Sequence, residues 1–179
     1  RDQDEPDKVL ADRLKHREQV LDRMQDEIAE FVTNLLSGNV PHSVAIEARR
    51  QIRIADEYES ISDYIYNLEK FDRKLRRNGH RFTPEQRDSL RSLNQHAAEY
   101  LAAINQGLAQ TNENILTSTE SLAKRLRDEI KSLRKKHLDD LSTGEIPPVV
   151  SVAFLASLNA FSRVRDHSRN IAETISGEK

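Results

Sequence analysis

The sequence contains no cysteine, and glycine and proline occur only five times each among its 179 residues. Without cysteine, neither a disulfide framework nor a thiolate site can form. No segment is apolar for long enough to cross a membrane, and no segment alternates apolar and polar residues as a half-buried strand does. The net charge is −2 with both signs mixed along the chain, which argues against the basic surface that nucleic-acid binding requires.

Motifs of enzyme active sites are missing as well. The sequence has no P-loop, no glycine-rich phosphate loop and no nucleophile elbow. A ferritin-like di-iron bundle needs Glu-x-x-His pairs, but none of the six histidines has a glutamate three residues before it. We therefore expect no catalytic site, and a metal-dependent enzyme is the least supported of the alternatives.

The few glycines and prolines stand where helices would end and begin. Glycine suits the left-handed residue that follows a helix, and proline suits the first helical turn. With the apolar periodicity, they predict helices over 6–37, 41–77, 84–141 and 148–176. The third would be roughly 85–90 Å long, which is too long for a compact domain, so we expect a break within 107–117. Capping boxes are predicted at Thr83 with Gln86 and at Thr117 with Glu120.

Apolar residues mark the faces that should be buried. In the first helix, a 4-3-4-3 spacing predicts a core seam of Leu10, Leu14, Arg17, Leu21, Met24, Ile28, Phe31 and Leu35. In the second helix, the apolar stripe is Ile54, Tyr58, Ile61, Ile65 and Leu68. In the last helix, we expect Phe154, Phe161, Val164, Ile171 and Ile175 to point inward. The sequence thus predicts an all-α, antiparallel up-down bundle of about five helices.

Acidic residues form a second stripe on the second helix. Asp56, Glu59, Asp63 and Asn67 follow one another at steps of three and four, roughly opposite the apolar stripe. We therefore expect these carboxylates to be accessible to solvent. Like charges at this spacing weaken an isolated helix by about 0.2–0.5 kcal/mol per pair, and a bound cation would compensate for that.

An internal repeat organises the chain. The segment Leu36-Ser-Gly-Asn-Val-Pro41 is similar to Leu141-Ser-Thr-Gly-Glu-Ile-Pro147, so the helix pair 6–37 and 41–77 matches 112–142 and 148–176. We predict one helical domain over 1–179, with a partial first repeat over 1–80 and a second repeat over 81–179. The counterpart of helix 84–106 would precede Arg1. Because the chain starts at Arg1 rather than Met, we interpret it as a piece of a longer protein or a processed one.

The stretch after each repeat turn carries a family resemblance. The segment Glu59-Ser-Ile-Ser-Asp63-Tyr-Ile-Tyr-Asn67 resembles the E/D-x-x-x-D motif of PhoU-like domains. The segment Phe161-Ser-Arg-Val-Arg-Asp166-His-Ser-Arg-Asn170-Ile-Ala-Glu173 resembles the ending of that motif more closely. The resemblance implies tandem three-helix bundles that regulate phosphate uptake and phosphate signalling without catalysis.

The resemblance also implies partners and a location. The run Leu158-Asn-Ala-Phe-Ser-Arg-Val-Arg-Asp-His and the missing first helix are most similar to the cytoplasmic tail of a bacterial sodium/phosphate cotransporter. The expected partner is a transmembrane phosphate transport module, in the same chain or separate, at the cytoplasmic side of the inner membrane. A homodimer is left open. The alternatives are a stand-alone PhoU-type adaptor acting on a phosphate transporter and a sensor kinase, or a helical scaffold without a ligand.

Some PhoU-like domains carry iron or zinc on their acidic motifs, so the resemblance implies a metal site here. The candidate ligands are Asp22, Asp26, Asp56, Glu59 and Asp63 in the first repeat. Their oxygen atoms also suit Mg, Mn or Ca. In the second repeat, serines stand at two of the matching positions, Ser132 and Ser162, so we expect no metal beside Asp166 and Asn170. The alternative is a solvated acidic face, and His167 is expected to be a surface or packed histidine rather than a ligand.

Overall fold

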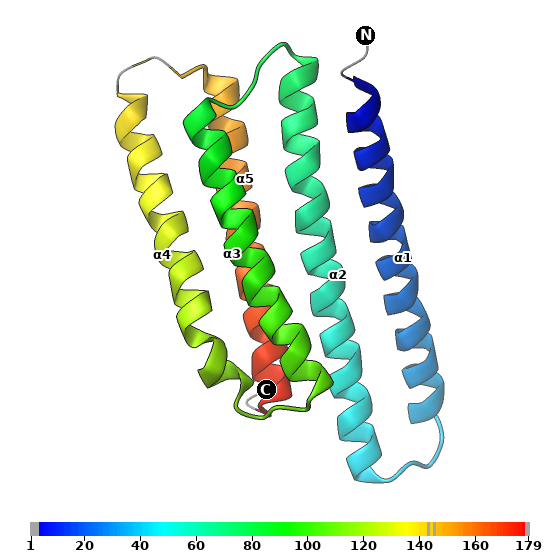
Figure 1. Ribbon diagram of the computed structural model, residues 1–179. Helices are drawn as coiled ribbons and strands as arrows, with labels where there is room; N and C mark the ends of the chain where they lie inside the picture. The colour runs from blue at the N-terminus through cyan, green and yellow to red at the C-terminus, as the bar shows by residue number, and fades with distance from the viewer. Residues whose placement is uncertain (1–3, 143, 145, 178–179) are drawn as a thin grey trace.

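The computed structural model describes residues 4–142, 144 and 146–177, and this part of the chain is helical with short connections. Five helices run alternately up and down (Figure 1): α1 (Asp4–Leu36), α2 (His42–Arg77), α3 (Pro84–Ala109), α4 (Ile115–Leu141) and α5 (Pro148–Ile175). No strand occurs among the described residues. The predicted all-α up-down bundle is confirmed, and so is the break within 107–117.

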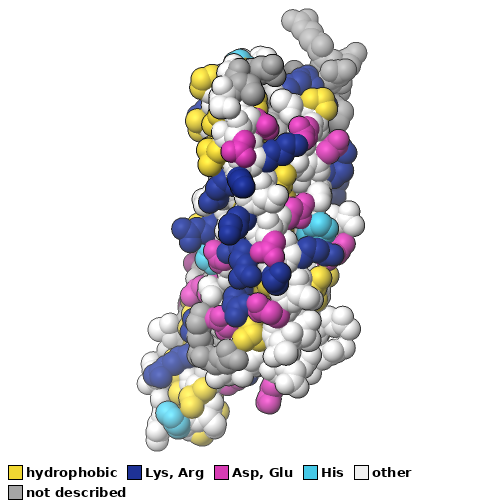
Figure 2. Space-filling view, turned by 90° about the vertical axis from the view of Figure 1, so that its left-hand side faces the viewer, with side chains coloured by type: hydrophobic (Ala, Val, Ile, Leu, Met, Phe, Trp, Pro, Cys, Tyr) yellow, Lys and Arg dark blue, Asp and Glu magenta, His cyan; other side chains and the backbone are white. Residues whose placement is uncertain are grey.

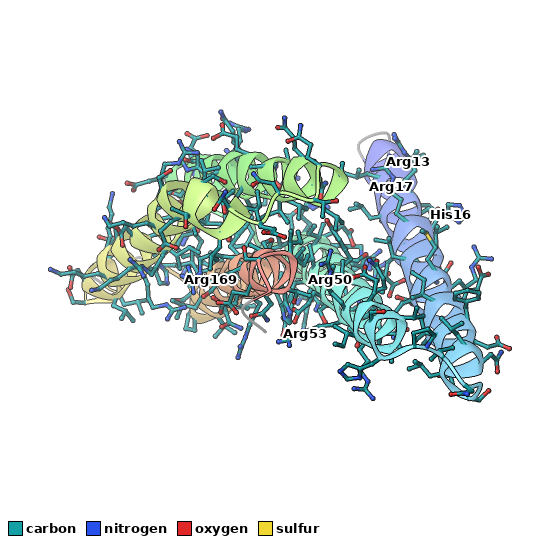
Figure 3. All side chains as sticks on the ribbon, turned by 90° about the horizontal axis from the view of Figure 1, so that it is seen from below. Arg13, His16, Arg17, Arg50, Arg53 and Arg169 are labelled. Atoms are coloured by element: carbon teal, nitrogen blue, oxygen red, sulfur yellow. The ribbon has the colours of Figure 1, made fainter. Side chains whose placement is uncertain are left out.

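The helices do not surround a single axis. The helices α2 and α5 pack against each other at the centre, and α3 and α4 pack on α5 and on each other. Among the residues that the structure describes, the remaining helix, α1, contacts α2 alone, and it lies at the edge of the molecule (Figures 1 and 3). The structure therefore consists of a three-helix bundle, α3–α4–α5, to which the pair α1–α2 is added through α2.

The core of the molecule is centred on α5. All five residues predicted to point inward from the last helix are buried: Phe154, Phe161, Val164, Ile171 and Ile175. Around them pack apolar residues of α3 and α4, among them Leu93, Ile104 and Leu126. The ring of Phe82, before α3, meets Phe154 edge-on with 6.3 Å between centroids, which closes one end of the bundle.

Helix α3 begins as the sequence predicts. The Thr83 hydroxyl accepts a hydrogen bond from the Gln86 backbone N–H at 3.1 Å, and the Thr83 N–H donates to Gln86 Oε1 at 3.0 Å. The second predicted capping box is wrong, because α4 begins at Ile115, two residues before Thr117. The turn before α4 instead holds Thr111 at a positive φ of 50° and uses the side chain of Asn112, whose Oδ1 accepts from the Asn114 N–H at 3.0 Å.

The predicted core seam of α1 is wrong in part. Leu10, Met24 and Phe31 are 52%, 50% and 67% exposed, and the other apolar residues of the seam are only half-buried. The physical reason is that α2 alone covers α1, so one side of the apolar seam has no helix against it. Ile65 of the α2 stripe is also exposed, whereas Ile54 and Ile61 of that stripe are buried.

The outer surface carries both signs of charge. Figure 2 shows the face on which α4 lies, where Lys and Arg side chains are interspersed with Asp and Glu. On α4 these charges form pairs such as Lys124 with Asp128, whose atoms lie 2.9 Å apart. Within the described part of the chain, none of the helices combines the length and the apolar character that crossing a membrane would need.

Candidate functional site

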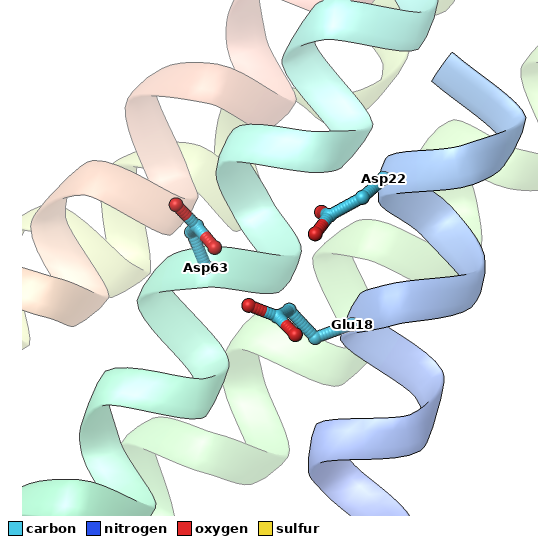
Figure 4. A group of neighbouring side chains, drawn as sticks. All are labelled: Glu18, Asp22 and Asp63. Carbon is cyan, nitrogen blue, oxygen red and sulfur yellow. The ribbon is translucent and has the colours of Figure 1, made fainter. Parts of the chain in front are cut away.

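Three carboxylates converge between α1 and α2. Glu18 and Asp22 lie one turn apart on α1 and reach toward α2, where Asp63 lies (Figure 4). One oxygen of each residue lies within 4.8 Å of the others. Glu18 and Asp22 are half-buried, while Asp63 is exposed. The cluster is therefore open to solvent on one side and bounded by both helices on the other.

The electrostatics around this cluster are unfavourable for the bare carboxylates. The Oδ1 atom of Asp22 is buried, and it has no hydrogen-bond partner among the described residues. Glu59 lies one turn before Asp63, and its pKa is raised above the ordinary value for glutamate. The largest cause is partial burial, followed by the negative charges of Asp63, Asp22 and Asp56. Negative charge thus accumulates here without a nearby cation to balance it in the contacts described.

The five residues proposed from the sequence are not brought together as one group. Asp22 and Asp63 belong to the cluster, and Glu59 is close enough for their charges to raise its pKa. Asp56 accepts a hydrogen bond from Gln25 Nε2 at 2.7 Å, and Asp26 is exposed outside the three-residue group. Each step of four residues rotates the side-chain direction by about 40° around the helix axis. Glu18 and Asp22 both remain on the side that faces α2, whereas Asp26, one step further, has turned away from it.

Glu18 was missed by the sequence reasoning. The signal was present, because Glu18, Asp22 and Asp26 continue a series of acidic residues at steps of four. Which two of the three would face α2 depends on how far α1 is rotated about its own axis. That rotation is set by packing across the helix pair, so the spacing alone could not select Glu18 over Asp26.

The cluster has the donor chemistry and the spacing for a hard cation. Two oxygens that each lie about 2.0–2.6 Å from one ion can be up to about 4–5 Å apart, and the three carboxylates meet that limit. Carboxylate donors suit Mg, Mn, Ca or iron better than a metal that prefers thiolates. The buried acceptor of Asp22 would gain a partner from such an ion.

The motif in α5 forms a different kind of contact. His167 Nδ1 lies 2.6 Å from Glu57 Oε2, and Asn170 Nδ2 donates to the same oxygen at 3.1 Å. The His167 ring stacks on Tyr64 with 5.6 Å between centroids, so this histidine is packed. Asp166 is paired with the neighbouring Arg165. These residues join α5 to α2, and Glu57 was not identified from the sequence because it falls between the two stripes of α2.

Comparison with known proteins adds a likeness over nearly the whole chain. No family model matches the sequence. Two curated relatives, from the Temecula1 and 9a5c strains of Xylella fastidiosa, are each named "Phosphate-specific transport system accessory protein PhoU homolog". Each is 28% identical over 172 residues, which covers 94% of this chain and 69% or 70% of the relative.

A solved structure shares the fold. The crystal structure of PhoU from Pseudomonas aeruginosa matches with a TM-score of 0.68 over 93% of this chain and 79% of that chain, at 17% sequence identity. At this identity the match concerns the fold alone. The chain therefore has the fold of the PhoU helical bundle, and the relatives and the fold together support its resemblance to PhoU-like proteins.

Proposed function

We propose that this chain is a PhoU-type accessory protein that regulates phosphate transport by binding rather than by catalysis. The observation that carries the proposal is the 28% identity to accessory proteins of phosphate-specific transport over 94% of the chain. The fold supports it, since the solved PhoU structure matches with a TM-score of 0.68. The partner in this proposal is a transmembrane phosphate transport module, and the chain acts at the cytoplasmic side of the inner membrane.

Phosphate uptake in a deletion strain tests this function. Cells without the gene should take up labelled phosphate at an altered rate when external phosphate is plentiful, and the wild-type gene should restore the original rate. The matched control is a copy carrying Leu158→Ala and Leu126→Ala, which removes buried core side chains and should fail to restore regulation because the fold is lost. Unchanged uptake and unchanged phosphate-starvation signalling in the deletion strain would contradict the proposal.

The cotransporter tail stays a prediction that rests on the α5 motif. The relatives are named accessory proteins, so the separate protein is the form that we propose first. The two forms differ in how the native polypeptide fractionates. A native polypeptide that remains in the membrane after washing with high salt, and that contains apolar spans of about 20 residues, would favour the transporter tail.

We also propose that the carboxylate cluster holds one divalent cation, which would neutralise the repulsion between α1 and α2. Glu18, Asp22 and Asp63 would hold the ion, and Glu59 and Asp56 would lie near it. The proposal is supported by the spacing of the oxygens and by the buried acceptor of Asp22. In this role the ion supplies positive charge and joins two helices; no reaction is assigned to it.

Calorimetric titration of chelator-treated protein with Mn, Fe(II), Zn and Mg tests the metal site. Binding should be lost in Asp22→Asn with Asp63→Asn, and it should persist in the control Asp166→Asn, which removes a carboxylate from the second repeat. A cation at one hundred times its Kd should stabilise the fold by about 2.7 kcal/mol, and the double variant should lack this gain. Equal binding by the wild type and the double variant would refute the site.

A further inference from the structure

One end of the bundle is basic although the chain as a whole is acidic. Helices α2 and α4 end here and α3 and α5 begin here, at the top of Figure 1. Residues 70–91 contain eight Lys or Arg and three Asp or Glu, a net charge of +5, and residues 131–152 contain four and three, a net charge of +1. Residues 4–8 of α1 reach the same end and lower the total to +4. Because the whole chain carries −2, the remaining residues carry −6, and this end attracts partners with negative charge.

Some basic side chains at this end are neutralised within the protein and others are not. Arg73 and Arg76 of α2 are paired within their own helix, with Glu69 at 3.5 Å and with Asp72 at 2.9 Å. Four exposed basic side chains at this end form no ion pair in the described part of the chain: Lys74, Arg77, Arg134 and Lys135. Their charges are therefore available to an external partner.

Apolar side chains are exposed at the same end, where α4 leads into α5. Among the described residues of α3, α4 and α5, four large apolar side chains are exposed, and all four lie here: Leu138, Leu141, Val149 and Val152. They occupy the last turn of α4 and the first turns of α5, and we call them the α4–α5 tip. Figure 2 shows hydrophobic side chains gathered at its upper left, above Lys and Arg side chains. Single exposed apolar residues are ordinary, but a group confined to one tip indicates a surface that contacts an apolar partner.

We propose that this end of the bundle binds the surface of an anionic lipid bilayer. The α4–α5 tip enters the headgroup region, and the four unpaired basic side chains contact the phosphates of the lipids. A bilayer of this kind presents negative charge beside an apolar layer, which matches both features of this end. An acidic protein surface or a nucleic acid would match the charge and leave the apolar tip in water.

The proposed contact also fits the distribution of charge over the whole molecule. With this end on the bilayer, the residues that carry the net charge of −6 are held away from the anionic headgroups. The contact goes beyond the function proposed above, because it needs neither phosphate nor a transport module. Vesicles that contain no protein therefore test it independently of that function.

Sedimentation with lipid vesicles tests the contact. The protein is first treated with a chelator, so that no divalent ion can join its carboxylates to the lipids. Vesicles of equal parts phosphatidylglycerol and phosphatidylcholine should bind the protein, and vesicles of phosphatidylcholine alone should bind it more weakly. Binding should decrease as salt is added, because exposed charges are screened beyond about 10 Å at an ionic strength of about 0.1 M. No binding to either kind of vesicle at low salt, or equal binding to both, overturns the proposal.

Removal of charge locates the contact on the molecule. Lys74→Gln with Arg77→Gln should weaken binding about thirtyfold, which corresponds to about 1 kcal/mol for each basic residue at the lipid surface. The matched control is Arg49→Gln with Arg163→Gln, because both arginines are exposed, lie away from this end and leave the same net charge. Circular dichroism checks that both double variants keep the helical fold. Equal weakening by the two would mean that net charge alone drives binding, and the proposed end would be excluded.

The absence of native cysteine allows entry of the tip into the headgroup region to be measured with a single label. Val152→Cys carries an environment-sensitive fluorophore, whose emission should shift to shorter wavelength when vesicles containing phosphatidylglycerol are added. Val152 is 68% exposed, so the label stays outside the core. The control is Arg49→Cys with the same label, about 42 Å from Arg77 along α2, and its emission should not change. No shift at position 152, or an equal shift at both positions, overturns the proposal.

Discussion

Gly107 of α3 lies against Ile115, the first residue of α4, and replacing it with alanine should destabilise the protein. A Cβ atom at this position would overlap Ile115 Cδ1 and lie 2.5 Å from Ile115 Cγ1 and 3.2 Å from Ile115 Cβ. Overpacking of this kind lowers the free energy of unfolding by about 1–3 kcal/mol. Replacing a helical glycine with alanine raises it by about 0.5–1 kcal/mol. The difference is a net loss of up to about 2.5 kcal/mol, because Ile115 is buried and its Cγ1 and Cδ1 atoms cannot rotate away without displacing core neighbours.

A double-mutant cycle with Ile115→Ala isolates this contact. Ile115 is buried, so Ile115→Ala alone should cost about 2–5 kcal/mol. In the double variant the Cβ at residue 107 enters the space that the isoleucine leaves, and the clash disappears. The double variant should therefore be no less stable than Ile115→Ala, which corresponds to a favourable coupling of about 1–3 kcal/mol.

Urea unfolding followed by circular dichroism at several temperatures measures each free energy in the cycle. For a chain of this size, 1 kcal/mol shifts Tm by about 2–4 °C, so the single Gly107→Ala change should be visible in a thermal scan as well. Additive effects within about 0.5 kcal/mol would mean that the two residues do not touch, and the described α3–α4 approach would then be refuted.

Four further substitutions test the remaining parts of the structure. Leu158→Ala, at a fully buried position of α5, should lower the free energy of unfolding by about 2–5 kcal/mol. Leu21→Ala, on the half-buried α1 seam, should lower it by no more than about 1–2 kcal/mol. Urea titrations that rank the two variants in the opposite order would contradict the described packing. Thr83→Ala removes the cap of α3 and should cost about 0.5–2 kcal/mol by the same titration. The raised pKa of Glu59 means that its carboxyl group binds a proton more tightly in the folded chain than in the unfolded chain. Above the folded-state pKa, the ionised carboxylate therefore lowers the free energy of unfolding. This destabilisation disappears as the pH falls below the ordinary pKa of glutamate. Without metal, Glu59→Gln should therefore have a higher Tm than the wild type at neutral pH. The gain in unfolding free energy should be no more than about 0.5 kcal/mol, because the side chain is partly exposed. Near about pH 3 the two proteins should have the same Tm.

The helices could be predicted because their ends are marked by local chemistry. Thr83 and Pro84 start α3 through a capping box that needs only four consecutive residues. Gly79 follows α2 with a φ of 74°, a conformation that glycine adopts without strain. Around the α3–α4 turn, the sequence predicted a capping box at Thr117, but the turn through Thr111 and Asn112 places the beginning of α4 at Ile115.

Burial on α1 could not be predicted because periodicity identifies an apolar face without showing what covers it. Phe31 and Phe154 both belong to apolar stripes at helical spacing, yet Phe154 is buried between helices and Phe31 is exposed. The difference arises from the number of neighbouring helices, which is a property of the assembled bundle. Prediction of the carboxylate cluster met the same obstacle. The sequence indicated Asp22 and Asp63, but the presence of Glu18 depends on how α1 is rotated against α2, which periodicity does not show.

The proposed cation site lies at the only contact described for α1, so its effect on stability should be local to that helix. Among the described residues, α1 packs on α2 alone, and the carboxylates at that contact repel one another. A cation between Glu18, Asp22 and Asp63 would hold α1 against α2. A ligand that binds only this arrangement stabilises it against local opening. Saturating Mn should therefore slow hydrogen exchange of the backbone amides of α1 more than those of α5, and it should leave both unchanged in the Asp22→Asn, Asp63→Asn variant. An equal Mn effect in both proteins would show that the ion acts elsewhere than at this cluster.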